Sequence, residues 1–511
     1  MDGTGEIILL QNRLPLVLKL IFNHLEEQIM KRYITYSLLT LMLMTTVISG
    51  CKKALEEDPK TFISPENFFK NPDSYELAVV GIYSGLPLYS GYKAMLLEMC
   101  TDIYGAPSAA AEQALPMYQN APAAFYYNTR EAWGDAYAII KNANFILEEL
   151  PKGPLEELKK KQLMAEARFL RAYAYFYLVQ LYGDIPMPVK PITDYANLQM
   201  PRTAQTEIYK LILEDLNYAE ANLPESTPAQ GRVYKLVSTA LLAKVYLTMG
   251  GSPLKQTQYF VNAKEKAVAV INSGKFKLVD EFASVFHKTV YTSESIWEQL
   301  YVTGLGGNPV HAITLTAATY NPILVPADWF INSFATGDRR KEWGIVQNYA
   351  GPNGTTLKPF FQKFADVSGV ASGTTSSGAI VSYTFPYLRL AEMYLIAAEA
   401  ENEVNGPGAA YTYINEIRKR ARVDKANVTN VPDLSGLSQQ QFREATWMER
   451  KWELCLEGST WFDLKRTNTM QNIQNRRGAG LINPIGAYNQ TWLIPDKEVV
   501  NNNIAQNPEY K

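Results

Sequence analysis

Residues 165–188 read AEARFLRAYAYFYLVQLYGDIPMP, and this aromatic stretch is the strongest indication of the fold class. At about 100° of rotation per residue, the rings gather on one helix face while the opposite face is also apolar. The rings on that face are Phe169, Tyr173, Phe176 and Tyr177. A helix that is apolar nearly all round is buried between other elements. Gly183 and Pro186 then end the helix and force an extended exit. The rings therefore predict packing inside a helical core and not a platform for a ligand.

Other stretches of the chain share this helical periodicity. They cover residues 131–150, 163–182, 234–251, 387–404, 408–423 and 438–458. In the last of them Ser438 offers an N-cap and Gly458 a stop. By contrast, residues 294–302 (ESIWEQLYV) predict a short strand.

Three of the predicted helices share the phrase Ala-x-x-Tyr-Leu, which occurs at 174–178, 243–247 and 391–395. Small residues followed by large ones let neighbouring helices approach closely, as they do in tetratricopeptide-like helix pairs. The irregular spacing of the phrase requires long insertions between the helical units. We therefore predict a mostly α fold: a tetratricopeptide-like helical-repeat scaffold with long loop-rich insertions and a few short strands.

The composition excludes several classes of function. The chain has 511 residues, of which 47% are hydrophobic, so it can bury a large core. Its 49 basic and 51 acidic residues leave a net charge of −2, which provides no electrostatic footprint for nucleic acid. Only three cysteines and three histidines are present, which disfavours an ordinary metal site or a Ser-His-Asp triad. We predict no catalytic residues, no metal and no cofactor.

Residues 30–53, MKRYITYSLLTLMLMTTVISGCKK, contain the most specific single signal in the chain. Two basic residues precede a mostly apolar run that is short for a membrane span but typical of a signal peptide. Small residues then lead to Cys51, as in a bacterial lipobox. We predict that Cys51 is acylated and anchors the protein to a membrane. The alternative is a signal peptide cleaved elsewhere, with an incidental cysteine.

The same segment sets the expected domain boundaries. We expect Met30 to be the translation start and residues 1–29 to be a gene-model extension, the alternative being a genuine extension. Residues 30–50 would then be a lipoprotein signal peptide and residues 51–70 a lipid anchor and tether. Residues 71–511 are expected to form a single α-helical domain.

Three glutamates in the last predicted helix, Glu449, Glu453 and Glu457, are spaced to lie along one helix face. Paired carboxylates serve as acid and base in glycosidases, but only where they flank a substrate in a cleft. Here basic residues and tryptophans surround them in the sequence. We therefore predict a structural charge network, which also perturbs carboxylates without catalysing anything.

The C-terminal part of the chain resembles the SusD/RagB family of outer-membrane nutrient-binding lipoproteins. The residues that carry the resemblance are ERKWELCLEGSTWFDLKR (449–466) and the closing LIPDKEVVNNNIAQNPEY (493–510). The lipobox and residues 169–186, 387–400 and 413–422 are similar as well, so the resemblance runs from Cys51 to Lys511. The chain departs from the family pattern at Leu456, Thr460 and Glu509. Thr460 replaces an arginine, which puts one local ion pair in doubt.

The resemblance implies a SusD-like fold and a cell-surface lipoprotein of the outer membrane that performs no catalysis. Such a protein binds oligosaccharide or polysaccharide and delivers it to a SusC-like TonB-dependent transporter. Three alternatives remain open: a helical-repeat scaffold that binds only its protein partner, the capture of a non-glycan nutrient such as peptide, and a lipoprotein glycosidase that no motif supports.

The family's ligand-contacting residues lie on variable loops, so the motifs do not transfer them to this chain. Residues 101–128 and 301–325 read as long loops, and loops of that length are usually functional. Exposed aromatic residues on loops point to binding, although ordinary loop packing is the alternative. The ligand-binding residues predicted on this basis are Tyr104, Tyr118, Tyr126, Tyr320 and Asn321.

Overall fold

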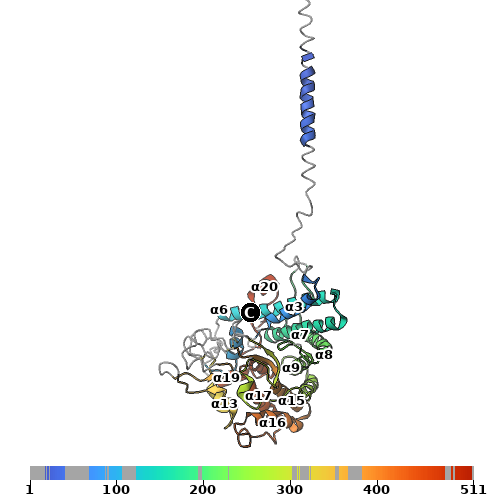
Figure 1. Ribbon diagram of the computed structural model, residues 1–511. Coiled ribbons are helices and arrows are strands. Elements are labelled where there is room, and N and C mark those ends of the chain that lie inside the picture. The colour runs from blue at the N-terminus through green and yellow to red at the C-terminus, as the bar shows by residue number, and fades with distance from the viewer. Residues whose placement is uncertain are drawn as a thin grey trace, which may run out of the picture. The chain divides into compact units, whose positions relative to one another are not determined.

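The structure is a computed structural model, and it separates into two units, residues 1–68 and residues 69–511 (Figure 1). The residues that it describes are 18, 20–21, 23–40, 68–86, 88, 91–105, 122–193, 198–227, 229–301, 308, 310, 322, 324–350, 356–365, 382–477, 485–486 and 490–508.

The first unit is described mainly by residues 23–40, which are helical and exposed to solvent. Among the described residues, no helix combines the length and apolar character that crossing a membrane requires. Cys51 lies outside the described residues, so its acylation stays a prediction.

The second unit is built mainly from helices. In chain order they are α3 (Pro72–Ile82), α4 (Gly91–Met99), α6 (Pro122–Glu149), α7 (Glu157–Tyr182), α8 (Gln205–Asn222), α9 (Lys235–Gly250), α10 (Tyr259–Ile271), α12 (Asp328–Ser333), α13 (Arg339–Glu342), α15 (Leu390–Asn405), α16 (Pro407–Ala421), α17 (Gln439–Leu454), α18 (Thr460–Arg466), α19 (Gln471–Arg477) and α20 (Asp496–Asn501). From α6 to α10 each helix packs against the next, α10 packs on α15, and α15 contacts both α16 and α17 (Figure 1). The predicted mostly α, helical-repeat fold is confirmed.

Helix α7 lies at the centre of the core. Phe169, Phe176 and Tyr177 are buried, and the half-buried Tyr173 meets the Trp297 ring edge-on with 5.1 Å between centroids. The prediction that these rings form a core is confirmed. The polar position Arg171 is also buried, because its guanidinium donates two hydrogen bonds of 2.8 Å to the Asp215 carboxylate of α8.

The predicted strand at 294–302 is confirmed as β1 (Ser295–Gln299), which pairs antiparallel with β4 (Phe385–Arg389). A second small sheet joins β2 (Ile345–Val346) to β3 (Phe360–Phe361). Because residues 387–389 belong to β4, the helix predicted to begin at 387 begins at Leu390 instead. Sheet pairing of Arg389 with Ser295 outweighs the local helical pattern at this point.

Both ends of α17 were predicted, and one prediction is wrong. Ser438 caps the helix: its hydroxyl accepts from Gln441 N at 3.3 Å and its backbone N–H donates to Gln441 Oε1 at 3.0 Å, a complete capping box. The helix ends at Leu454, however, and not near Gly458. Leu456 adopts a left-handed φ of 65°, so Glu457 lies in the turn after the helix and not on its face.

Replacing Ser438 by alanine is expected to lower the free energy of unfolding by about 1 kcal/mol, because the backbone N–H of Gln441 loses its capping acceptor. Urea unfolding of the full chain measures this loss. Ser435→Ala, in the exposed turn before the cap, is the matched control and should leave stability unchanged. Equal losses in the two variants would contradict a specific capping role.

Candidate functional site

The three glutamates of the predicted charge network are buried and paired. Glu453 accepts from Arg389 at 2.6 Å and from Arg420, and it lies 3.4 Å from Arg340. Glu449 pairs with Arg340 and with Arg418, each at 2.6 Å. Burial alone would raise the pKa of Glu453, but Arg420, Arg389 and Arg340 outweigh it and hold the pKa well below its usual value.

The burial of these carboxylates decides their role. The side chains of Glu449 and Glu453 have no exposed surface, and 6% of the Glu457 side chain is exposed. Glycosidase carboxylates must face a sugar bond from two sides, and an external sugar cannot reach these groups. The predicted structural network is confirmed, and it joins β4, α13, α16 and α17.

Tyr104 does not have the exposed ring that its predicted role assumes. It is 1% exposed, its hydroxyl donates to Glu98 Oε2 at 2.7 Å, and its ring packs on Phe361 with 5.2 Å between centroids. The prediction that Tyr104 is an exposed ligand-binding residue is corrected, because residues 101–105 are packed against the rest of the fold and are not a free loop.

The other predicted ligand-binding residues lie mostly beyond the described part of the chain. Tyr126 belongs to α6 and not to a loop, because the helix begins at Pro122, well before the expected start at 131. The Tyr126 side chain is not among those that the structure describes. Tyr118, Tyr320 and Asn321 lie outside the described residues altogether, so their roles stay predictions.

The structure does bring together the described ends of the two predicted loop regions. Tyr104 forms an antiparallel bridge with Pro326. On either side of the bridge, Gly105 N donates to Val325 O at 2.7 Å and Ala327 N donates to Ile103 O at 2.8 Å. The first loop region therefore begins, and the second loop region ends, at the same place in the fold.

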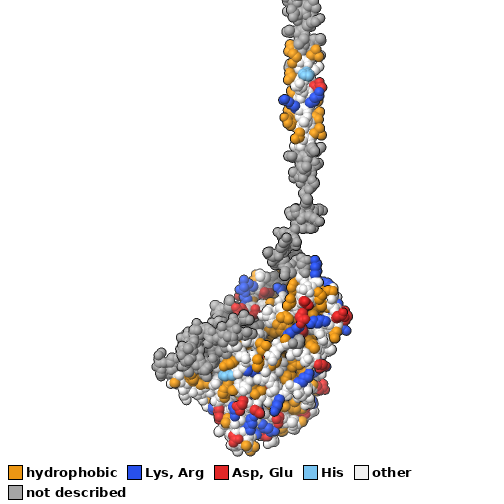
Figure 2. Space-filling model, viewed as in Figure 1, with side chains coloured by type: hydrophobic (Ala, Val, Ile, Leu, Met, Phe, Trp, Pro, Cys, Tyr) orange, Lys and Arg blue, Asp and Glu red, His pale blue; other side chains and the backbone are white. Residues whose placement is uncertain are grey.

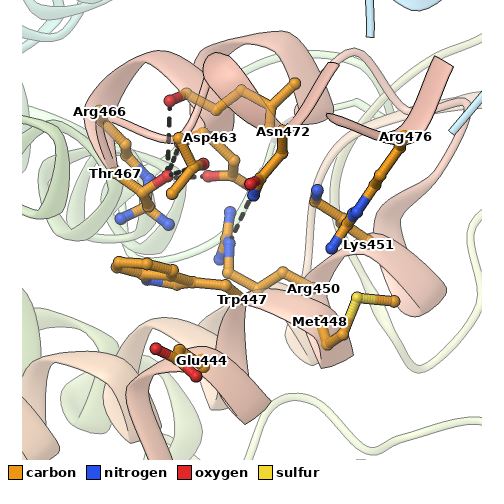
Figure 3. A pocket seen from close by; sticks show the side chains of 12 residues that line it. Glu444, Trp447, Met448, Arg450, Lys451, Asp463, Arg466, Thr467, Asn472 and Arg476 are labelled. Carbon is orange, nitrogen blue, oxygen red and sulfur yellow. Dashed lines mark hydrogen bonds and ion pairs between the residues drawn. The ribbon is translucent and has the colours of Figure 1, made fainter. Parts of the chain in front are cut away.

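A pocket of about 470 Å³ opens beside α17, α18 and α19 (Figure 3). We call it the α17–α19 pocket and define it by Trp447, Arg450, Lys451, Asp463, Asn472 and Arg476. Helical spacing explains the arrangement, because positions three and four apart share one helix face. Trp447 therefore lies beside Arg450 and Lys451 on α17, and Asn472 lies one turn before Arg476 on α19.

Two cations of the pocket share one buried carboxylate. Lys451 Nζ and Arg476 Nη1 each lie 2.5 Å from Asp102 Oδ2, and Asp102 is fully buried. The Arg476 guanidinium also lies over the Trp329 ring, 3.9 Å from its centroid. Burial lowers the pKa of Lys451, and the nearby Arg476 adds to this effect although Asp102 opposes it.

Asp463 links Arg450 and Arg466 on the other side of the pocket. Its Oδ2 accepts from Arg450 Nε at 2.9 Å and its Oδ1 accepts from Arg466 Nε at 2.7 Å. Burial raises the pKa of Asp463, but the two arginines outweigh it and lower the pKa to about 2. Arg450 is 2% exposed, and its Nη1 has no hydrogen-bond partner among the described residues.

The sequence pattern did not predict this pocket. Arg450 and Lys451 were expected only as neighbours of the glutamates, although their spacing from Trp447 placed all three on one face. Asp102 carried no local signal at all. Within the described part of the chain, no group of three His, Cys, Asp or Glu side chains is arranged to hold a metal ion.

Two family models together match nearly all of the second unit. The model described as SusD family matches residues 213–510. The model described as starch-binding, associating with outer membrane, matches residues 73–247.

Individual proteins are similar over most of their length. SusD-like protein P25 of Formosa agariphila is 28% identical over 83% of this chain and 88% of its own. Starch-binding protein SusD of Bacteroides thetaiotaomicron is 26% identical over 73% of this chain and 77% of its own. The crystal structure of a SusD superfamily protein from Parabacteroides distasonis has a TM-score of 0.73 at 24% identity and covers 86% of this chain and 99% of that protein. This last likeness shows the fold.

Proposed function

This chain belongs to the SusD family, and we propose on that basis that it is an outer-membrane lipoprotein that binds glycans at the cell surface. We further propose that it delivers them to a SusC-like TonB-dependent transporter and performs no catalysis. The observation that carries the proposal is the family match over residues 213–510. The second family description, with its starch binding and outer membrane, and the name of the Bacteroides thetaiotaomicron relative support it.

The fold supports a binding role in two ways. The glutamates that resemble a catalytic pair are enclosed by arginines, so they leave no acid and base for hydrolysis. The start of the first loop region is joined to the residues that follow the second at the Tyr104–Pro326 bridge. We propose that Tyr118, Tyr320 and Asn321 bind the glycan, with the rings stacking on sugar C–H faces.

The described residues on the visible face of the second unit do not form the basic patch that a nucleic acid partner would need. Figure 2 shows basic and acidic side chains interspersed over the visible face of the second unit, in keeping with the net charge of −2. A nucleic-acid-binding domain would instead gather basic residues into a patch or stripe.

Calorimetric titration of the full chain with plant, microbial and host glycans tests the proposed function. Binding to one class of glycan is the expected result and identifies the cargo. If a sample that melts cooperatively binds no glycan of the panel, glycan capture is contradicted. That result would favour a peptide cargo or a scaffold that binds only the transporter.

Tyr118→Ala and Tyr320→Ala are each expected to weaken binding of that glycan about tenfold or more, because a stacked ring is an anchor of the interface. The affinity is measured by the same titration, with the melting temperature as a check on folding. Tyr413→Ala removes a half-buried ring of α16, outside both loop regions, and is the control. Unchanged affinity in both loop variants would remove these tyrosines from the site.

A further inference from the structure

We propose that the α17–α19 pocket binds a sugar unit that carries a negative charge, either a carboxylate or a sulfate group. This inference rests on the proposed glycan-binding function and adds a second site to it, apart from the loop tyrosines. Three features of the pocket support it: its charge, its unused hydrogen-bond donors, and its size and lining.

The first feature is a surplus of positive charge in the lining of the pocket. Lys451 and Arg476 share the single carboxylate of Asp102, which leaves one positive charge without a counter-ion among the described residues. On the other side, the charges of Arg450 and Arg466 are balanced by Asp463 and Glu399. An anion placed beside Lys451 and Arg476 would supply the missing charge.

The remaining carboxylate that lines the pocket does not fill this role. Glu444 is exposed, and its Oε1 accepts a 2.6 Å hydrogen bond from Gln440 Nε2. Figure 3 shows Glu444 at the opposite end of the view from Lys451 and Arg476. An exposed carboxylate at that position is solvated by water and contributes little to the charge around the two cations.

The second feature is a set of donors that are not used within the described part of the chain. Arg450 Nη1 is buried without a hydrogen-bond partner, which costs free energy unless a ligand or water accepts from it. In Figure 3 the Arg450 guanidinium lies between Trp447 and Asp463, in the middle of the pocket lining. Lys451 Nζ also has donors beyond the one that Asp102 accepts. Oxyanions make the strongest hydrogen bonds to such donors.

The third feature is what distinguishes a charged sugar from a bare anion. At about 470 Å³ the pocket is within the range of about 300–1,000 Å³ that is usual for small-molecule sites, and it far exceeds the size of a sulfate ion. The half-buried Trp447 ring offers an apolar surface for sugar C–H groups. The half-buried Asn472 amide, which has no hydrogen bond to a described residue, can serve hydroxyl groups.

Titration of the full chain with matched oligosaccharides tests the charge preference. The probes are oligomers of galacturonate, glucuronate and mannuronate, the methyl esters of the same oligomers, a sulfated galactan oligomer, and inorganic sulfate. At least one charged oligomer is expected to bind about tenfold more tightly than its neutral counterpart, and added salt should narrow the gap. The carboxylated and sulfated probes separate the two sources of charge.

A pair of isosteric variants tests the location. Asn472→Asp places a carboxylate in the pocket and is expected to weaken binding of the charged oligomer by about tenfold or more, through like-charge repulsion. Asn475→Asp makes the same change on the exposed side of α19, outside the pocket lining, and should change the affinity less than about twofold. Both variants spare the buried ion pairs, so the fold is expected to survive.

Three outcomes would overturn the inference: methyl esters that bind as tightly as the acids, equal losses in the two variants, or inorganic sulfate that binds as tightly as the sulfated oligomer. If neutral glycans still bind and respond to the loop tyrosine variants, the proposed function stands while the inference fails. If no glycan of either kind binds, both fail.

Discussion

Replacing Glu453 by glutamine is expected to remove about 3–5 kcal/mol from the free energy of unfolding, a large part of the total stability of a typical domain. Glu453 is fully buried among Arg389, Arg420 and Arg340, which are themselves almost fully buried. A neutral glutamine would leave these guanidinium groups with an uncompensated charge in a medium that solvates it poorly. Urea unfolding of the full chain measures the loss.

Glu444→Gln is the matched control, because Glu444 lies on the same helix but is exposed to solvent. It should change stability by less than about 0.5 kcal/mol. A loss below about 1 kcal/mol in Glu453→Gln would show that the network contributes little to folding.

The same substitution should also change how stability depends on acid. The pKa of Glu453 is lower in the folded chain than its usual value of 4.5, so the unaltered chain loses this stabilisation as the pH falls below about 4.5. The variant has no carboxylate at that position, and that part of its acid dependence should disappear. Unfolding measured at several acidic pH values in both proteins shows whether the unaltered chain loses more stability with falling pH than the variant does.

Replacing Lys465 by methionine is expected to stabilise the chain near neutral pH. Lys465 is buried on α18, its Nζ donates to the carbonyl of Gln180, and it lies 5.5 Å from the centroid of the Trp461 ring. It forms no ion pair with a described residue. Burial therefore lowers the pKa of Lys465 from 10.5 to about 7. Methionine fills similar space without a charge to desolvate.

The pH dependence follows from this lowered pKa. Between about pH 7 and 10.5 the unfolded chain holds a proton on Lys465 that the folded chain has released. The free energy of unfolding therefore rises with pH over this window, by up to ~1.4 kcal/mol per pH unit from this group. Below about pH 7 both states hold the proton, and the full cost of burying the charge is present.

Measuring the free energy of unfolding near pH 6, 7.5 and 9 compares the two proteins. The free energy of unfolding of Lys465→Met should exceed that of the unaltered chain most at the lowest pH. The difference should shrink as the pH rises. Lys210→Met, which removes an exposed lysine of α8, is the control and should follow the unaltered chain. A variant that is less stable at pH 6 and shows a parallel pH dependence would contradict the lowered pKa.

Local pattern was sufficient for those features whose cause is local. The apolar pattern all round residues 163–182 predicted a buried α7, Ser438 predicted the cap of α17, and residues 294–302 predicted β1. The family resemblance rested on residues 449–466, and both family models and the fold confirm it. A structural charge network around Glu453 was also predicted, but its partners in the fold are Arg340, Arg389 and Arg420, which come from other segments of the chain.

Predictions failed where a distant segment decides the conformation or the environment. Residues 387–389 are helical by pattern but form strand β4, because β1 lies beside them. Tyr104 looks like an exposed loop aromatic, yet Glu98 and Phe361 bury it. The misses at α8 and α10 have no such cause, because the buried residues of both helices recur at helical spacing within their own sequence.

Residue patterns alone were enough to predict the class of this protein: a helical core, a lipid anchor, the SusD family and a composition that is neither basic nor metal-binding. These features depend on composition and on residues that lie close together in the sequence, within a single helix or motif. Which charges meet became clear only from the folded chain. Lys451 and Arg476 acquire their shared partner from Asp102, which lies 349 residues before Lys451 in the chain. Because Coulomb and hydrogen-bond energies depend on distance in space and on burial, no spacing along the chain could have predicted the charged pocket that these residues form.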